Sequence, residues 1–138
     1  MIFTNKKITI LVSCFLLFFS VCFAQKNEMV KIVKDKNENK ISIFIGQKLF
    51  TSFLYPDTLE KPVLYPLYAA NGIMVTRGFP MHPLPGEPTD HPHHLGLWFT
   101  YENVNGLDFW NNSYAIPADK KHLYGWIRTD RVLETKDG

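Results

Sequence analysis

The sequence predicts an all-β fold, and an antiparallel β-sandwich is the architecture we expect. Three observations lead to this prediction. Apolar and polar residues alternate in three closely spaced runs, turn-forming residues separate those runs, and no stretch of ten or more residues shows helical periodicity. Because alternation at this spacing is typical of hairpin-connected strands, the fold class follows from local pattern alone.

The first three strands are expected to form an antiparallel meander. Met29–Lys34 alternates, and Asp35–Asn39 supplies a polar turn. Lys40–Ile45 alternates again, Gly46-Gln47 turns the chain, and Lys48–Tyr55 continues the pattern. Short turns of this kind join neighbouring antiparallel strands, so we expect the three runs to pair in order.

Further strands are expected on both sides of a long loop. The loop, Arg77–Pro92, holds five prolines and two glycines and leads directly into a histidine cluster. Long loops in compact domains are commonly functional or disordered, and its position here favours function. The segments predicted as strands are Val63–Ala70 and Ile73–Thr76 around Asn71-Gly72, Leu95–Tyr101, a Val104–Leu107 hairpin leading into Asp108–Trp110, and Leu123–Leu133.

Residues 1–24 are predicted to be a secretory signal peptide. Met1–Lys7 carries two lysines, Ile8–Ala24 is uncharged and mostly apolar, and cleavage is expected after Ala24. An uncleaved membrane anchor and a lipoprotein signal at Cys14 are the alternatives. We therefore expect export to the periplasm or the extracellular space, with no membrane attachment after cleavage.

Removal of such a signal changes the composition. Both cysteines, Cys14 and Cys22, lie within it, so the exported chain would rely on its core rather than on disulfides. Loss of Lys6 and Lys7 leaves thirteen basic against thirteen acidic residues, a balance that gives no reason to expect nucleic acid as a partner. Residues 25–138 would form one domain, and its abrupt end after a strand-like run leads us to expect a truncated domain.

Three of the five histidines lie within four positions of one segment. Pro92 disfavours helical backbone at His91, so we expect extended backbone in which His91 and His93 share one face and His94 points to the other. The pair His91 and His93 would suit a divalent transition metal, completed by Glu87, Asp90 or His82.

Without a metal, the same residues are candidates for general acid–base catalysis near neutral pH. The candidate catalytic set is His91, His93, His94 and Asp90. Polar decoration of a surface loop is the competing interpretation. The sequence contains no cupin-type glutamate after the His-x-His pair, no His-Glu-x-x-His, no Gly-x-Ser-x-Gly, no phosphate loop and no Cys-x-x-Cys, which removes support for those enzyme classes.

Aromatic residues crowd the region of the histidines, and Trp98 is expected on the same strand face as His94. A tryptophan beside histidines and carboxylates is suited to stack on a sugar ring while polar groups bond its hydroxyls. Core packing is the competing interpretation, above all for Phe99, Phe109 and Trp126. The candidate substrate-binding residues are Arg77, Trp98, Asp108, Trp110 and Asn111.

Four separated blocks carry a resemblance to a known family. They are Thr76–Pro80, Asp90–His94, Gly96–Phe99 and Val104–Ser113. In that order they resemble the DUF6807 family, which also carries the label "methane oxygenase PmoA", and the likeness covers about Pro62 to the C-terminus. Leu95 stands where many members have arginine, and Glu102-Asn103 stands where Gly-Asp is common.

The resemblance implies an exported β-sandwich domain longer than this chain, similar in architecture to the galactose-mutarotase-like supersandwiches that act on sugars with histidine and carboxylate. The label implies methane oxidation, yet the chain after the signal has no apolar run long enough to span a membrane.

We therefore expect an exported carbohydrate-active or carbohydrate-binding protein with saccharide as its ligand. A metal-dependent oxidoreductase and a non-catalytic sugar-binding module are the alternatives.

Overall fold

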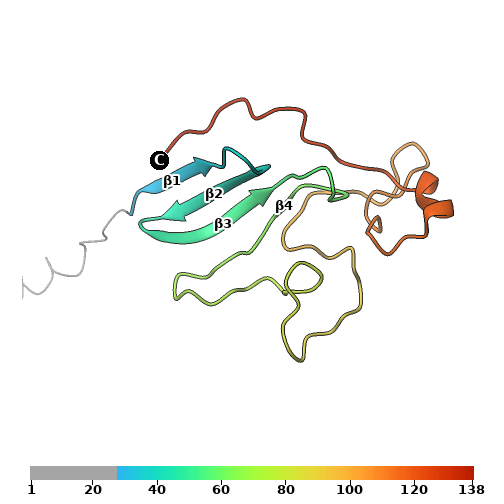
Figure 1. Ribbon diagram of the computed structural model, residues 1–138, viewed down its shortest axis with the longest axis horizontal. Helices are drawn as coiled ribbons and strands as arrows, with labels where there is room; N and C mark the ends of the chain where they lie inside the picture. The colour runs from blue at the N-terminus through green and yellow to red at the C-terminus, as the bar shows by residue number, and fades with distance from the viewer. Residues whose placement is uncertain (1–27) are drawn as a thin grey trace, which may run out of the picture.

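The computed structural model describes residues 28–138, and its regular part is one four-stranded antiparallel sheet (Figure 1). The strands are β1 (Val30–Lys34), β2 (Lys40–Ile45), β3 (Lys48–Leu54) and β4 (Val63–Leu64), and they pair in chain order. The meander predicted from alternation is confirmed, and so is the all-β class. The predicted signal peptide lies outside the described residues.

Local chemistry explains both turns of the meander. The Asp35 carboxylate accepts hydrogen bonds from the backbone amides of Asn37 and Glu38, at 2.8 and 3.0 Å, which closes the turn between β1 and β2. Gly46 adopts a left-handed conformation, with φ at 61°, in the tight turn between β2 and β3. A register shift between Ile43 and Phe44 marks a bulge against β3.

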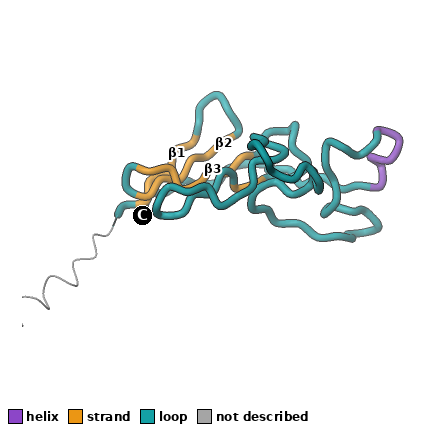
Figure 2. The backbone as a smooth tube through the Cα atoms, turned by 90° about the horizontal axis from the view of Figure 1, so that it is seen from below, coloured by secondary structure: helices purple, strands orange, loops and turns teal. Residues whose placement is uncertain are grey.

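The second half of the chain is largely irregular, as Figure 2 shows by its loop colour. The predicted hairpin at Val104–Leu107 is confirmed, because these two residues form reciprocal backbone hydrogen bonds of 3.0 and 3.1 Å around Asn105 and Gly106, both at positive φ. A 3₁₀-helix, η1 (Ala118–Leu123), was not predicted.

The other predicted strands do not form over their full length. Val63–Ala70 keeps only β4, and Pro66, which lacks an N–H, follows soon after it. Leu95–Tyr101 retains a single bridge, Leu64 to Leu97, and Ile73–Thr76 another, Tyr68 to Met74. The predicted Asp108–Trp110 and Leu123–Leu133 strands are reduced to one bridge, from Asp108 to Tyr124. The first of these segments does lie beside β3, since the amides of Tyr65 and Tyr68 donate to the carbonyls of Ser52 and Phe50, but Pro66 interrupts the ladder between them.

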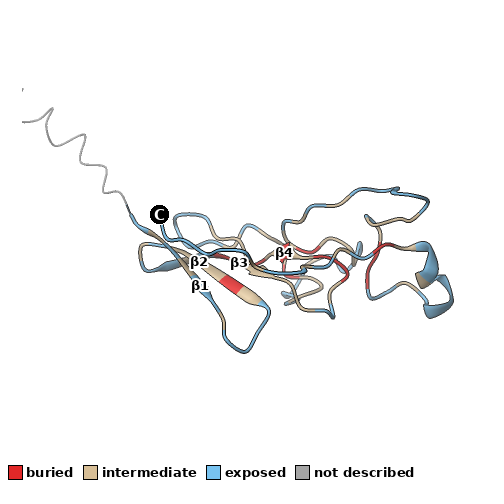
Figure 3. Cartoon of the chain, turned by 90° about the horizontal axis from the view of Figure 1, so that it is seen from above, coloured by how far each residue is buried: buried red, intermediate tan, exposed pale blue. Residues whose placement is uncertain are grey.

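The core is small and lies where the loop region meets β4. Val63, Tyr65 and Leu95 form the buried cluster, and Figure 3 shows buried residues running from the sheet into the loops. One face of the sheet, with Ile32, Ile43 and Phe53, lines an apolar groove of about 710 Å³. Within residues 28–138 no second sheet covers that face, so the two-sheet part of the sandwich prediction is not confirmed.

The C-terminal segment returns to the edge of the sheet. Gly138 and Val30 exchange two backbone hydrogen bonds of 2.9 Å, and the Asp137 carboxylate accepts one from the amide of Ile32 at 2.7 Å. Figure 1 shows this segment running back beside β1. Among the described residues, no helix has both the length and the apolar character needed to cross a membrane.

Candidate functional site

The three clustered histidines lie on a tight turn rather than on a strand. The amide of His94 donates a hydrogen bond to the carbonyl of His91 at 3.0 Å, with Pro92 and His93 between them. His91 has φ at 49°, in the left-handed region, so the expectation of extended backbone at this residue is wrong. The physical reason is that the bond closing the turn outweighs the local preference that Pro92 imposes.

The turn brings all three imidazole rings together. Ring centroids are 4.3 Å apart for His93 and His94, 5.0 Å for His91 and His94, and 5.7 Å for His91 and His93. The prediction that His94 points away from the other two is therefore wrong. A strand would have alternated the three side chains, whereas a turn of four residues gathers them.

Asp90 holds one ring of the cluster. Its Oδ2 lies 2.6 Å from His91 Nδ1, and its Oδ1 lies 3.6 Å from the Arg77 guanidinium. The hydrogen bond to His91, with the nearby positive charge of Arg77, holds the pKa of the Asp90 carboxyl below its usual value. An anchored Nδ1 leaves Nε2 of His91 as the ring nitrogen available to a ligand.

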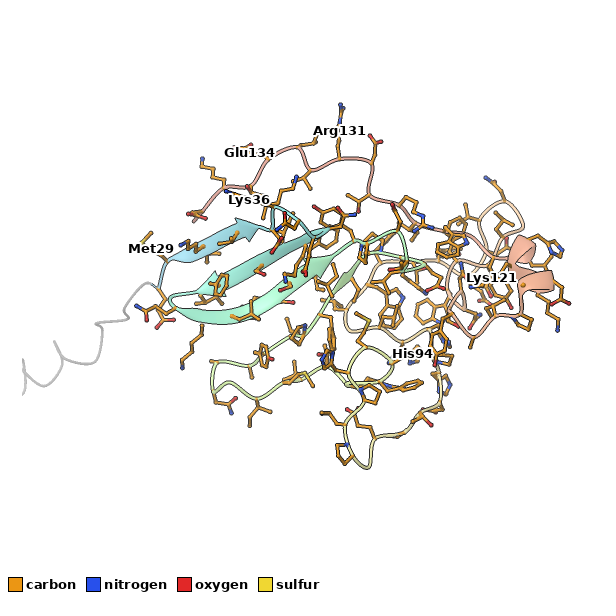
Figure 4. All side chains as sticks on the ribbon, viewed as in Figure 1. Met29, Lys36, His94, Lys121, Arg131 and Glu134 are labelled. Carbon is orange, nitrogen blue, oxygen red and sulfur yellow. The ribbon has the colours of Figure 1, made fainter. Side chains whose placement is uncertain are left out.

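Two tryptophans stand against the histidine cluster. Trp98 lies 5.5 Å from the ring of His94, Trp110 lies 6.5 Å from it, and the two indoles are 5.8 Å apart. Trp98 and His94 are close as predicted, but they do not share a strand face, because no strand forms over residues 94–98. The indole nitrogen of Trp98 is buried without a hydrogen-bond partner among the described residues. Figure 4 shows His94 within the loop region, away from β1.

Burial keeps two of the histidines neutral. Desolvation, with the neighbouring charges of His94 and Lys61, lowers the pKa of His93 to about 4. Desolvation also lowers the pKa of His94, helped by His91 and Arg77. At neutral pH both rings therefore offer one donor and one acceptor nitrogen each, as a ligand rich in hydroxyl groups requires.

Sequence reasoning missed Lys61, whose ammonium group lies next to both tryptophans. Its side chain is 1% exposed, and Nζ donates to the backbone carbonyls of Trp110 at 2.6 Å and Phe109 at 3.3 Å. Nζ also lies 5.6 Å from the centroid of the Trp98 ring. Desolvation lowers the pKa of Lys61 to about 8. Its partners lie nearly fifty residues away, so no local signal in the sequence marks it.

A second buried polar group holds the segment that follows Trp110. Asn112 is fully buried and donates from Nδ2 to the carbonyl of Gly125 at 2.7 Å. Lys121 Nζ donates to the Ser113 carbonyl at 2.6 Å and pairs with the Glu60 carboxylate at 3.3 Å. Figure 4 shows Lys121 at the end of the molecule that carries η1. These contacts position the segment, and sequence reasoning missed Lys121 and Glu60.

Asp108 and Asn111, both predicted substrate-binding residues, are bonded to each other. The Asp108 carboxylate accepts hydrogen bonds from the backbone amide of Asn111 at 2.9 Å and from its Nδ2 at 2.7 Å. The structure therefore brings Asp108, Trp110 and Asn111 together in one turn next to Lys61. Asp108 also acts on the cluster at a distance, since its negative charge partly opposes the lowering of the pKa of His93.

Glu87 and Arg77 shape the proline-rich loop. The Glu87 carboxylate accepts hydrogen bonds from the backbone amides of Gly78, Phe79 and Leu84, at 2.7 to 3.1 Å, and these bonds, that of Gly78 foremost, hold its pKa below the usual value. Arg77 donates to the carbonyls of Phe79, Pro88 and Asp90. Glu87, predicted as a metal ligand, and Arg77, predicted as a substrate-binding residue, thus both have hydrogen-bond partners within the loop itself.

The structure does not assemble the predicted metal set of His91, His93 and Glu87. Within residues 28–138, no group of three or more histidine, cysteine, aspartate or glutamate side chains is arranged to hold a metal ion. The carboxylate of Glu87 is engaged by backbone amides, and His82 is exposed. The arrangement that the structure does show is a cluster of three histidine rings, with His91 anchored by Asp90 and with two tryptophans beside the cluster.

The fold and site define an all-β protein with a histidine–tryptophan site on a loop beside a small antiparallel sheet. The profile of the DUF6807 family, described as a family of unknown function, matches residues 40–138, and the chain belongs to this family. The match includes β2 to β4 and every residue of the candidate site. No curated protein matches the chain, and no solved structure does.

Proposed function

We propose that this chain is an exported carbohydrate-active or carbohydrate-binding protein whose saccharide ligand lies against Trp98 and Trp110. The observation that supports it is the pair of indoles, 5.8 Å apart, standing beside the neutral rings of His93 and His94. Sugars present one apolar face and a rim of hydroxyl groups, so an aromatic wall flanked by neutral donors and acceptors is complementary to them.

The polar side of the site also supports acid–base chemistry on the bound sugar. Asp90 orients His91 through Nδ1 at 2.6 Å, and His91 is exposed, so Nε2 can accept a proton from a hydroxyl group and return it. His93 and His94 would bond the remaining hydroxyls. A protein with the same arrangement that binds sugar without converting it would be a sugar-binding module, and a turnover assay separates the two.

The test is saccharide binding by isothermal titration calorimetry, with a glycan panel used first to find the ligand. Trp98→Ala is expected to weaken binding about tenfold or more, because the sugar loses its aromatic wall. Trp126→Ala is the matched control and should leave affinity unchanged, since Trp126 is exposed to a similar degree as Trp110 and packs on Arg128 rather than on the histidines. Equal affinity of wild type and Trp98→Ala, or no saccharide bound at all, would contradict the proposal.

Turnover and metal content are measured on the same samples. His91→Ala with unchanged binding and lost turnover would identify an enzyme, whereas binding without turnover in wild type would identify a module. Elemental analysis of the chain from Gln25 onward, beside a His91→Ala/His93→Ala variant, addresses the alternative chemistry. A stoichiometric transition metal that the variant lacks would place metal-dependent oxidation ahead of the sugar-directed reaction.

A further inference from the structure

A separate groove has Trp110 in its wall. It encloses about 600 Å³, within the range of roughly 300–1,000 Å³ that small-molecule sites occupy. Its lining residues are Thr100, Tyr101, Glu102, Asn103, Trp110 and Asn111. None of the three histidines lines it. Trp110 thus belongs to both places, because its ring lies near the rings of His94 and Trp98 and it also lines this groove.

The polar groups of the groove are incompletely bonded. The hydroxyl oxygen of Thr100 is buried without a hydrogen-bond partner among the described residues, an arrangement that costs free energy unless a ligand or water completes it. Asn111 uses Nδ2 to bond Asp108, and Asn103 uses Oδ1 to accept from the amide of Gly106, so each amide keeps its other group for a ligand.

The aromatic walls of the groove are accessible. Tyr101 is 67% exposed and Trp110 is exposed as well. Large aromatic side chains contribute most to binding energy when a ligand covers them. An exposed tyrosine and tryptophan around a hydroxyl and two amides have the composition of a site for a polar ring with apolar faces. Glu102 adds a carboxylate that forms no ion pair within residues 28–138.

We propose that this groove is a second saccharide subsite, so that the ligand is an oligosaccharide of at least two rings laid across Trp110. One ring lies against Trp98 and the histidines, and the next lies between Trp110 and Tyr101 with its hydroxyls bonded to Thr100, Asn103 and Asn111. This inference rests on the proposed function, because it takes the ligand of the first subsite to be a sugar.

The experiment measures affinity against chain length. Calorimetry is run with β-1,4-linked glucose, mannose and xylose oligomers of one, two and three rings. The longer oligomers are expected to bind at least tenfold more tightly than the monosaccharide of the same series. Tyr101→Ala should abolish that gain and leave monosaccharide affinity unchanged. Tyr114→Ala, at a tyrosine that is 63% exposed outside the groove, is the matched control and should change neither.

Thr100→Val gives a second test that loss of folding cannot mimic. Replacing an unbonded buried hydroxyl by a methyl group of the same shape should raise the Tm of the free protein. The same variant should weaken binding of the two- and three-ring oligomers several-fold, because the ligand loses a hydrogen bond. A rise in Tm together with a loss of affinity for oligomers alone supports the subsite.

The outcomes separate this inference from the proposed function. If monosaccharides bind and longer oligomers bind no better, the subsite is wrong and the proposed function stands. If Tyr101→Ala weakens monosaccharide and oligomers equally, the groove belongs to the first site and the inference is also wrong. If no saccharide of any length binds, both proposals fail together.

Discussion

At the scale of single residues, the site depends on which histidines stay uncharged. Burial lowers the pKa of His93 to about 4, whereas in the unfolded chain it titrates near 6.5. Between these values the unfolded state binds more protons, so stability falls as pH falls from 6.5 towards 4. We expect the Tm to drop by several degrees across that window, and His93→Gln to flatten the drop. An identical pH dependence in His93→Gln would contradict the burial of this ring.

Lys61 carries a second prediction at this scale. Lys61→Met keeps the apolar stem but leaves the carbonyls of Phe109 and Trp110 without their donor. We expect the free energy of unfolding to fall by roughly 1–3 kcal/mol in urea denaturation. Lys48→Met, at an exposed lysine of β3, should change it little. A more stable Lys61→Met protein would show that desolvation of the ammonium group outweighs its hydrogen bonds.

At the scale of elements, Gly96 decides how the segment after the histidine turn meets β4. It has φ at 58°, and a Cβ there would lie 2.6 Å from the carbonyl oxygen of Leu64. Leu64 and Leu97 form reciprocal backbone hydrogen bonds of 2.8 and 3.1 Å beside it. Any side chain at residue 96 would therefore push this segment, and Trp98 with it, away from the sheet.

Gly96→Ala is expected to lower the free energy of unfolding by roughly 2 kcal/mol or more and to shift the fluorescence of Trp98. Gly86→Ala separates the cost of the left-handed backbone from the cost of the close contact with β4. Gly86 also has positive φ, at 80°, but a Cβ there meets nothing within 4 Å. Gly86→Ala should cost about 1 kcal/mol and leave the fluorescence unchanged. Equal losses in the two variants would mean that close approach to β4 does not matter.

At the scale of the whole molecule, the sheet presents an apolar groove to solvent. Phe99 lines this groove and is 85% exposed. Because hydrophobic dyes bind exposed apolar grooves, we expect the chain from Gln25 onward to enhance the fluorescence of anilinonaphthalene sulfonate. Phe99→Ser should reduce the enhancement. Leu133→Ser, at a leucine 82% exposed outside the groove, is the control, and equal reductions would place the dye elsewhere.

Much of the sheet was predictable because its information is local. Alternation over six residues, with a turn at either end, is enough to place β2, and Asn105-Gly106 is enough to place a hairpin. Val63–Ala70 shows the limit of this reasoning, since its apolar pattern continues past Pro66, which has no N–H to pair, and only two residues form β4. Pairing needs a partner, and no local pattern specifies one.

For the candidate site, the sequence by itself determined the membership of the histidine cluster. Only the tertiary structure decided that His91, His93 and His94 share one turn, that Glu87 serves its own loop, and that Lys61 lies behind Trp110. The physical reason is distance along the chain. A turn closed by one hydrogen bond can override local preference, and a buried lysine is defined by carbonyl groups nearly fifty residues away.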